Sequence, residues 1–490
     1  MRFQVFHDGK CVDRFTLNGA YLFGTDGIAI RRSEVRFENG FIECKKPNME
    51  TAALALLWPV EGFGEVLLPT TCLPQREKPY NLNVEVARAK LMQIINKREE
   101  WSFFDKIHGL SHIADEAQSL FIRAIQNISS PETAAKLADE SLKRAIVFSE
   151  KVAAKQAESL FTERSATHGF GRGCLGCKVN PRQVNQPQYV GKLRELFNFV
   201  TVPISWAQVE KQKGQYDFSV IDNCIDILTQ KKVAIGAGPV LCFAKEQMPK
   251  WLADSGEDFE RIRDAAYDFV LNTVTRYCDQ VRLWRVLSSL NALNCFSFTF
   301  EQSLEMTRAA TMAVKAASEK SLKIVEIGNP WGEYYGKTSG TIPPLVYMDM
   351  ILHSGMNFDA FGVQMRFGKN ADGMHVRDML HISAVLDYFS AVAKPLHITE
   401  VEVPSKNCEP NGGNSAGIWH QQWDQAQQAE WIGQFYKIAL SKSFVNTVTY
   451  SSLTDAADNV IASGGLLTEQ LKEKKSFQTV KKLKEVIFSR

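Results

Sequence analysis

Apolar and polar residues alternate in short runs along the first 80 residues, and turn signals separate the runs. Asn-Gly or Asp-Gly pairs occur four times here, the last between the alternating runs 35–38 and 41–44. Such pairs favour the positive backbone angles of tight hairpin turns, so the pattern indicates antiparallel strands. We therefore predict a small β-sandwich-like domain over residues 1–80.

After Pro79 the apolar residues change to helical spacing. Three segments rich in Ala, Leu, Glu and Lys follow this spacing: 83–100, 111–127 and 131–160. Pro131, after two serines, is typical of a capped helix start with proline in the first turn. This region predicts a helical connector over residues 81–165, packed between two larger units.

From residue 166 onward, strand-like apolar runs alternate with helical segments. The runs are 199–202, 233–236, 281–287, 323–327, 358–363, 396–401 and 445–450, and the glycine-rich stretch 169–171 opens the series. Alternation of this kind is typical of parallel strands joined by crossover helices. The count approaches eight, so we predict an α/β fold whose C-terminal part, residues 166–490, is a (β/α)8 TIM barrel. No glycine-rich phosphate loop follows these strands, which argues against a dinucleotide cofactor.

Composition narrows the possible partners and location. The chain is 45% hydrophobic and 23% charged with a formal net charge of +2, which is typical of a soluble globular protein and gives no sign of a nucleic-acid partner. The N-terminus turns polar too early for a signal peptide, and no apolar stretch approaches 18 residues, so we expect a cytoplasmic protein without a membrane partner. The Cys174 and Cys177 pair has half-site spacing but no second pair, so we expect neither a metal nor another cofactor.

Candidate chemistry begins at the strand 396–403. It delivers the carboxylate of Glu400 at its C-terminal end and that of Glu402 two residues later. Barrel enzymes build their active sites at this end of the strands, so Glu400 is a candidate nucleophile. The alternative is a glutamate that only pairs with a neighbouring arginine.

Six segments in the same order resemble glycoside hydrolase family 10, the retaining β-1,4-xylanase barrels, over roughly residues 166–490. They are 206–218 with its Trp, Glu and Gly, 248–251, 276–286, 358–364, 398–400 and 453–455. The resemblance implies a β-linked carbohydrate substrate and Glu400 as the nucleophile. With the nearby aromatic and polar residues, it leads us to expect these substrate-binding residues: Trp206, Trp251, Gln364, Arg366, Trp331, Tyr334, Trp419 and Trp423.

The sequence also departs from the family pattern. The family's general acid/base glutamate falls on Ser289, and the asparagine before it falls on Ser288. A serine cannot protonate a leaving oxygen near pH 7. The residues that hold the glycone sugar in the family are replaced by Thr201, Val202 and Ser205, so xylan binding in the family's manner is not expected.

Two glutamates of the next strand and its loop are candidates for a relocated acid/base. Glu326 lies inside an apolar strand and is expected to face the barrel interior, where the alternative is a pairing with Arg285 or Arg366. Glu333 follows in a loop among aromatic residues, which suit both sugar stacking and a raised acid pKa. The alternative for Glu333 is a surface loop with a packed aromatic cluster.

Two further features keep alternatives open. Arg285 and Arg366 suit the capture of an acidic sugar, a uronate or a sulfated unit, and equally suit structural pairing. The loop 404–414, followed by Trp419 and Trp423, is either a lid or sugar-contacting wall, or a segment whose tryptophans pack on the barrel edge.

Two functional hypotheses follow. The first is a divergent glycoside hydrolase acting on a β-linked poly- or oligosaccharide, with Glu400 as nucleophile and Glu326 or Glu333 as acid/base. The second is a catalytically inactive barrel that binds carbohydrate or a protein partner, with the N-terminal β domain as an accessory binding module. No oligomeric state is predicted.

Overall fold

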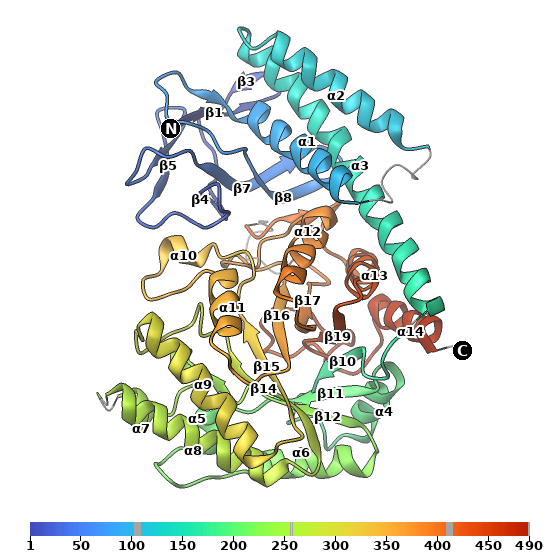
Figure 1. Ribbon diagram of the computed structural model, residues 1–490. Coiled ribbons are helices and arrows are strands. Elements are labelled where there is room, and N and C mark those ends of the chain that lie inside the picture. The colour runs from blue at the N-terminus through green and yellow to red at the C-terminus, as the bar shows by residue number, and fades with distance from the viewer. Residues whose placement is uncertain (102–108, 168, 255, 257, 408–414, 489–490) are drawn as a thin grey trace.

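The computed structural model describes every residue except 102–108, 168, 255, 257, 408–414 and 489–490 (Figure 1). It consists of small β-sheets, then a helical region, then a closed parallel barrel, so the predicted fold class is confirmed. No helix within the described part of the chain combines the length and the apolar character that crossing a bilayer requires.

The N-terminal strands are short and form two larger sheets. They are β1 (Arg2–Gln4), β2 (Phe6–His7), β3 (Lys10–Cys11), β4 (Tyr21–Phe23), β5 (Glu34–Glu38), β6 (Phe41–Lys45), β7 (Ala53–Val60), β8 (Gly64–Pro69) and β9 (Tyr80–Asn81). One sheet has the order β5-β6-β1-β9, and the other has the order β18-β8-β7-β4. The predicted hairpin joins β5 to β6, because Asn39 and Gly40 adopt φ values of 51° and 79° that suit its turn.

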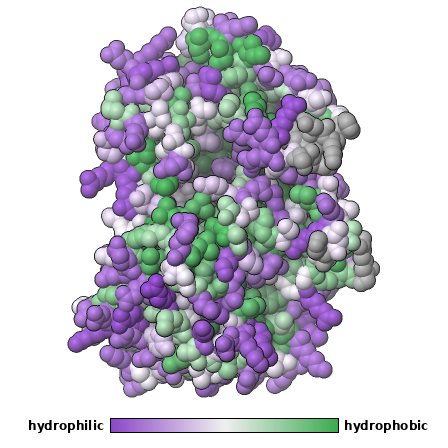
Figure 2. Space-filling model, in the orientation of Figure 1, coloured by the Kyte–Doolittle hydropathy of each residue, from purple (hydrophilic) through white to green (hydrophobic). Residues whose placement is uncertain are grey.

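Strand β7 is buried on both faces, although an antiparallel strand on a surface would bury only one. Leu54, Leu56 and Trp58 belong to the main core. Ala55 and Leu57 form a second small cluster with Leu67. This second face lies on the barrel, because a Cβ at Gly417 would lie 2.9 Å from a Leu57 methyl group. Figure 2 shows apolar residues where the N-terminal unit meets the barrel, on an otherwise mostly polar face.

Within the described residues, three helices connect the two units: α1 (Leu82–Glu100), α2 (Ser111–Gln126) and α3 (Pro131–Thr167). The side chain of Asn81 caps α1 by accepting from the backbone N–H of Val84. The 37-residue α3 packs on α1 and α2 at one end and on the barrel helices α12 (Met379–Phe389) and α13 (Gln425–Ser441) further along (Figure 1). A buried ion pair of 2.7 Å between Lys90 and Asp378 ties α1 to the start of α12.

Eight parallel strands make the barrel: β10 (Leu175–Lys178), β11 (Phe199–Val202), β12 (Ala234–Ala237), β14 (Val281–Ser288), β15 (Leu322–Ile327), β16 (Ala360–Arg366), β17 (Leu396–Glu402) and β19 (Val445–Tyr450). Pairing of β12 with β14 and of β10 with β19 closes the ring. The short β13 (Leu241–Cys242) extends the third strand beside β14.

Outer helices and short connecting elements complete this unit: α4 (Pro187–Leu196), α5 (Trp206–Val209), α6 (Ser219–Gln230), η2 (Lys245–Gln247), α7 (Lys250–Ala253), α8 (Phe259–Tyr277), α9 (Phe300–Ala317), α10 (Tyr334–Lys337), α11 (Pro344–His353), η3 (Ser390–Val392), β18 (Ile418–Trp419) and α14 (Lys475–Phe488).

The first barrel strand lies later than the sequence pattern suggested. The stretch 169–171 was expected to open the series, but the strand is Leu175–Lys178. Gly169 has a φ of 66°, which interrupts an extended strand. The correction matters because it puts a lysine, Lys178, at the carboxyl end of the first strand.

Candidate active site at the carboxyl end of the barrel

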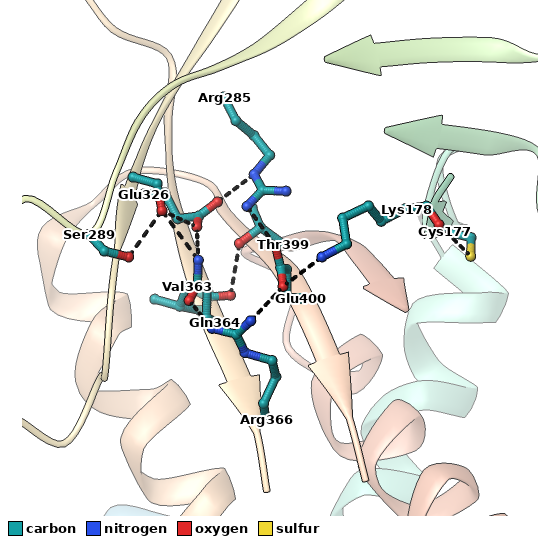
Figure 3. Close-up of polar contacts among 11 residues, drawn as sticks. Cys177, Lys178, Arg285, Ser289, Glu326, Val363, Gln364, Arg366, Thr399 and Glu400 are labelled. Carbon is teal, nitrogen blue, oxygen red and sulfur yellow. Dashed lines mark hydrogen bonds and ion pairs between the residues drawn. The ribbon is translucent and has the colours of Figure 1, made fainter. Parts of the chain in front are cut away.

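Glu400 lies at the centre of a cluster of cations (Figure 3). One oxygen, Oε1, accepts from Arg285 Nη2 at 3.1 Å. The other, Oε2, accepts from Arg366 Nη1 at 3.0 Å and from Lys178 Nζ at 3.2 Å. The three cations come from β16, β14 and β10, so the closed barrel brings together residues that are far apart in the sequence.

The contacts set the charge state of Glu400. Burial alone would raise the pKa of this carboxyl, but Lys178, Arg366 and Arg285 outweigh that effect and hold the pKa well below its usual range. Glu400 is therefore an anion throughout the physiological pH range. Its side chain is only 6% exposed.

Glu326 lies beside Glu400 and shares Arg285 with it (Figure 3). Arg285 Nε donates to Glu326 Oε2, while Ser288 Oγ, at 2.7 Å, and Gln364 Nε2 both donate to Glu326 Oε1. The pairing with Arg285 that the sequence left open is thus present. Both the arginine and the glutamate are almost fully buried, with side chains 2% and 0% exposed.

Strand register explains why these groups meet. Ser288 pairs with Glu326 across β14 and β15, and Gln364 pairs with Glu400 across β16 and β17. Gln364 also accepts from Arg366 Nη2 at 2.7 Å, so it joins the Glu326 side of the cluster to the Glu400 side. The polar network is therefore one connected layer across the barrel.

The position of the family's acid/base is occupied by a buried serine. Ser289 is 3% exposed and lies 3.0 Å from Ser288, oxygen to oxygen. Its φ of 57° is unusual for a residue other than glycine, and its backbone N–H bonds to the Glu326 carbonyl at 2.9 Å. A Cβ at Gly328 would lie 2.5 Å from the Ser289 oxygen, so the packing here is tight.

Glu402, two residues after Glu400, is a carboxyl with a raised pKa. Burial raises its pKa to about 7, against the opposing effect of Lys178. The side chain is 0% exposed, and a Cβ at Gly464 would lie 2.5 Å from its Cγ. Glu402 is thus a packed group beneath the loop that follows β19.

Glu333 has different surroundings from those expected. It is 1% exposed, at the start of α10, and accepts from the backbone N–H of Gly373 and from Arg377. Arg377 in turn lies 4.0 Å from the centre of the Trp331 ring. Glu333 thus joins the loops after β15 and β16, and the contacts of its carboxylate are with Gly373 and Arg377. Its catalytic role stays a prediction, as does that of Glu326.

The predicted sugar-binding tryptophans near β11 lie in the outer shell. Trp206 is 2% exposed, stacks on Phe269 of α8 with ring centres 5.0 Å apart, and donates to Glu210 at 2.6 Å. Trp251, at the start of α7, donates to the Glu210 carbonyl at 3.0 Å. The structure does not join either ring to the Glu400 cluster, and the contacts give both a packing role.

The aromatic residues after β15 also pack inward. Trp331 lies edge-on to Phe367, with ring centres 5.5 Å apart. Tyr334 is 3% exposed, and its hydroxyl donates to the Ile342 carbonyl at 2.6 Å and accepts from Asn291. Substrate contact by these rings stays a prediction.

Trp419 and Trp423 occupy the segment after β17. Trp419 is fully buried within β18, which pairs with β8 of the N-terminal sheet, and its ring N–H lies 3.4 Å from Glu150 of α3. Trp423 is 6% exposed and donates to the Gly417 carbonyl at 3.4 Å. These contacts favour packing over a sugar-contacting wall. The expected flexible part of this loop, 408–414, lies outside the described residues.

The N-terminal unit contacts the loops after three barrel strands in succession. Arg31 donates to the Thr341 carbonyl after β15, at 2.7 Å. Leu67 donates its backbone N–H to Val376 after β16, at 2.8 Å. Strand β18, which follows β17, pairs with β8 of the N-terminal sheet. The N-terminal sheets are therefore part of the wall around this end of the barrel, rather than a separately tethered module.

Cys174 and Cys177 are both buried free thiols, and burial raises the pKa of Cys174 to about 12. No group of three or more metal-ligating side chains occurs among the residues that the structure describes. The expectation of no metal stays a prediction.

Lys178 is the functional candidate that sequence reasoning missed. The signal was present but misread, because the first strand was placed at 169–171 and not at Leu175–Lys178. A lysine as the last residue of a barrel strand points to the same end of the barrel as Glu400.

Comparison with known proteins agrees with the barrel fold. The family model of glycosyl hydrolase family 10 matches residues 165–483. The solved structure of native xylanase 10B from Thermotoga maritima has 16% identity and a TM-score of 0.50, and the match covers 69% of this chain and 99% of that one. Xylanase XynB from Paenibacillus barcinonensis, complexed with a conduramine derivative, has 15% identity and a TM-score of 0.50, with coverage of 65% and 97%.

No curated protein gives a match to this chain. At such low identities the solved structures establish the fold alone, whereas the family model spans well over half of the sequence. The chain therefore belongs to glycosyl hydrolase family 10.

Proposed function

We propose that this chain is a divergent glycoside hydrolase that acts on a β-linked oligo- or polysaccharide, with Glu400 as the nucleophile. We further propose that it cleaves glycosidic bonds whose leaving group departs without being protonated. The observation that carries the proposal is Glu400 at the end of β17, held by three cations, with Ser289 in place of an acid directly after β14.

A retaining glycosidase uses two carboxyl groups, one to attack the anomeric carbon and one to protonate the leaving oxygen. Glu326 is unsuited to the second task because its known partners, Arg285, Ser288 and Gln364, all donate hydrogen bonds to it. A carboxylate that accepts from donors on both oxygens has no proton to give.

Glu333 is unsuited for the same reason, since Gly373 and Arg377 donate to its two oxygens. Glu402 holds a proton near neutral pH, but its side chain is fully buried. The proposed chemistry therefore relies on the leaving group itself.

The first experiment measures hydrolysis of aryl β-glycosides that differ only in the acidity of the phenol. A missing general acid lowers rates by roughly 10²–10⁴-fold for poor leaving groups and far less for good ones. We expect 2,4-dinitrophenyl glycosides to be cleaved at least about 100-fold faster than 4-nitrophenyl glycosides of the same sugar. Added azide should accelerate turnover and yield a β-glycosyl azide, because a small anion can attack the glycosyl-enzyme without a general base.

Two variants make this test specific. Glu400→Gln removes the nucleophile and should abolish cleavage of the dinitrophenyl glycosides. Glu319→Gln, an exposed glutamate in the loop before β15, removes the same charge at the other end of the barrel and should leave the rate unchanged. If the wild-type protein hydrolyses no dinitrophenyl glycoside, the hydrolase proposal is refuted.

A second candidate function is glycan binding without cleavage. It is favoured by the three cations on Glu400, because a carboxylate neutralised on both oxygens is a weaker nucleophile and a weaker partner for a cationic transition state. Calorimetric titration with neutral β-linked oligosaccharides separates the two functions. Binding of the oligosaccharides without hydrolysis of the dinitrophenyl glycosides would support glycan binding without cleavage.

A further inference from the structure

The charges of the Glu400 cluster do not cancel. Three permanent or near-permanent cations, Lys178, Arg285 and Arg366, face two paired carboxylates, Glu400 and Glu326. Glu402 adds little negative charge below neutral pH, because burial raises its pKa to about 7. Below pH 7 the layer thus keeps a net positive charge at the end of the barrel where barrel enzymes bind their ligands.

The three cations differ in how far they reach toward solvent. The side chain of Lys178 is 24% exposed and that of Arg366 is 13% exposed, whereas that of Arg285 is 2% exposed. Lys178 and Arg366 also approach the same oxygen of Glu400. These two side chains therefore form the solvent-facing edge of the cluster, and Arg285 lies behind them.

All three cations of the cluster have N–H donors that no protein group accepts among the described residues. Arg366 uses Nη1 on Glu400 and Nη2 on Gln364, while its Nε is buried and has no hydrogen-bond partner among the described residues. Arg285 likewise has a buried Nη1 without a partner in the described part of the chain. The ammonium group of Lys178 carries three N–H donors and places one of them on Glu400. Buried cationic donors without acceptors are costly, so this pattern points to an anion that completes the site.

We propose that the sugar recognised at this site carries an anionic substituent, a carboxylate or a sulfate, which Lys178 and Arg366 bind beside Glu400. This inference rests on the proposed function, because it names the class of glycan that the same site takes. A neutral xylan or glucan unit offers only hydroxyl groups, which do not balance the positive charge of Lys178 and Arg366.

The test compares three β-linked oligosaccharides of equal length by calorimetric titration. One bears a glucuronic acid, the second is its carboxyl-reduced neutral counterpart, and the third is a sulfated form of the neutral one. We expect at least one anionic form to bind roughly tenfold or more tightly than the neutral form at low salt, and the difference to shrink as sodium chloride is raised toward 0.5 M. This comparison needs only the wild-type protein. Preference for the uronate or for the sulfate identifies which anion the site takes.

Variants then assign the preference to the cluster. Lys178→Gln and Arg366→Gln should each reduce the ratio of anionic to neutral affinity to below about threefold. The matched controls are Lys231→Gln after α6 and Arg282→Gln at the start of β14, both exposed at the opposite end of the barrel, which should keep the wild-type ratio. Thermal melting of every variant checks that each one is folded.

The outcomes separate this inference from the proposed function. Binding of neither neutral nor anionic oligosaccharides contradicts both. Equal binding of all three forms overturns the anionic-sugar inference and leaves glycan recognition standing. A strong preference for anionic sugars that survives in both Lys178→Gln and Arg366→Gln also overturns the inference, because other residues would then bind the anionic substituent.

Discussion

Removal of Arg285 tests whether the polar layer of the barrel depends on this arginine. In Arg285→Met, Glu400 keeps two cations, Lys178 and Arg366, whereas Glu326 keeps only the neutral donors Ser288 and Gln364. The side chain of Glu326 is 0% exposed, so its carboxylate cannot turn to water. Loss of one partner from such a buried pair is expected to destabilise the fold by about 3–5 kcal/mol.

The loss of stability in Arg285→Met should depend on pH, and most of it should disappear when Arg285 and Glu326 are both replaced. At pH 8 the orphaned carboxylate stays charged, whereas near pH 5 it can take up a proton and escape most of the penalty. In Arg285→Met with Glu326→Met, two apolar side chains of similar volume fill the space, and such replacements are often neutral or stabilising. We therefore expect the double variant to recover most of the lost stability.

Urea unfolding followed by tryptophan fluorescence at pH 5 and pH 8 measures these differences. Arg282→Met is the control, since this exposed arginine lies on the same strand and should change stability by no more than about 0.5 kcal/mol. A loss below about 1 kcal/mol for Arg285→Met at pH 8, or a double variant no more stable than the single one, would refute this account of the layer.

Two further predictions concern the pH dependence of stability and the contact between the units. Burial raises the pKa of Glu402 to about 7 from an ordinary value of 4.5, so the native state holds a proton that the unfolded chain loses between these values. Stability should therefore fall by about 3 kcal/mol as the pH rises from 4.5 to 7. The difference in unfolding free energy between wild type and Glu402→Gln, measured across this range, should show that fall. A difference that does not change with pH would contradict the prediction. In Gly64→Ala, the added Cβ would lie 2.5 Å from the Ile418 carbonyl oxygen, so pairing of β8 with β18 should loosen and backbone hydrogen exchange at 415–421 should speed up. Gly62 also has a positive φ, 71° against 118° at Gly64, but an added Cβ there meets only a flexible lysine atom at 3.8 Å. Equal exchange in Gly62→Ala and Gly64→Ala would refute the contact argument.

The periodicity of the sequence was enough to predict the main architecture. Period-two runs with Asn-Gly turns gave the N-terminal sheets, and alternating apolar runs and helical segments gave the barrel. Both patterns arise within single elements, where side-chain direction follows directly from the local backbone. The one misplaced barrel strand followed from reading the glycine-rich stretch 169–171 as extended, although Gly169 takes a positive φ.

The partners of the charged residues were much harder to predict. Two arginines were possible partners of Glu326 from the sequence, and only the register between β14 and β15 decides for Arg285. It placed Glu333 among neighbouring aromatic residues, whereas the partner of its carboxylate, Arg377, comes from the next loop of the barrel. Ion pairs of this kind join different strands and loops, so no local pattern specifies them.

The sequence by itself determined the barrel, the position of Glu400 at the end of a strand and the serine at the family's acid/base position. Only the tertiary structure decided what surrounds Glu400, because Lys178 and Arg285 approach it from strands separated from β17 by more than 100 residues, and barrel closure alone brings them together. It also decided that Trp419 joins the N-terminal sheet, since that pairing needs β8 to lie against the loop after β17. Local periodicity fixes the elements, but the electrostatics of the site depend on how the closed barrel places distant charges side by side.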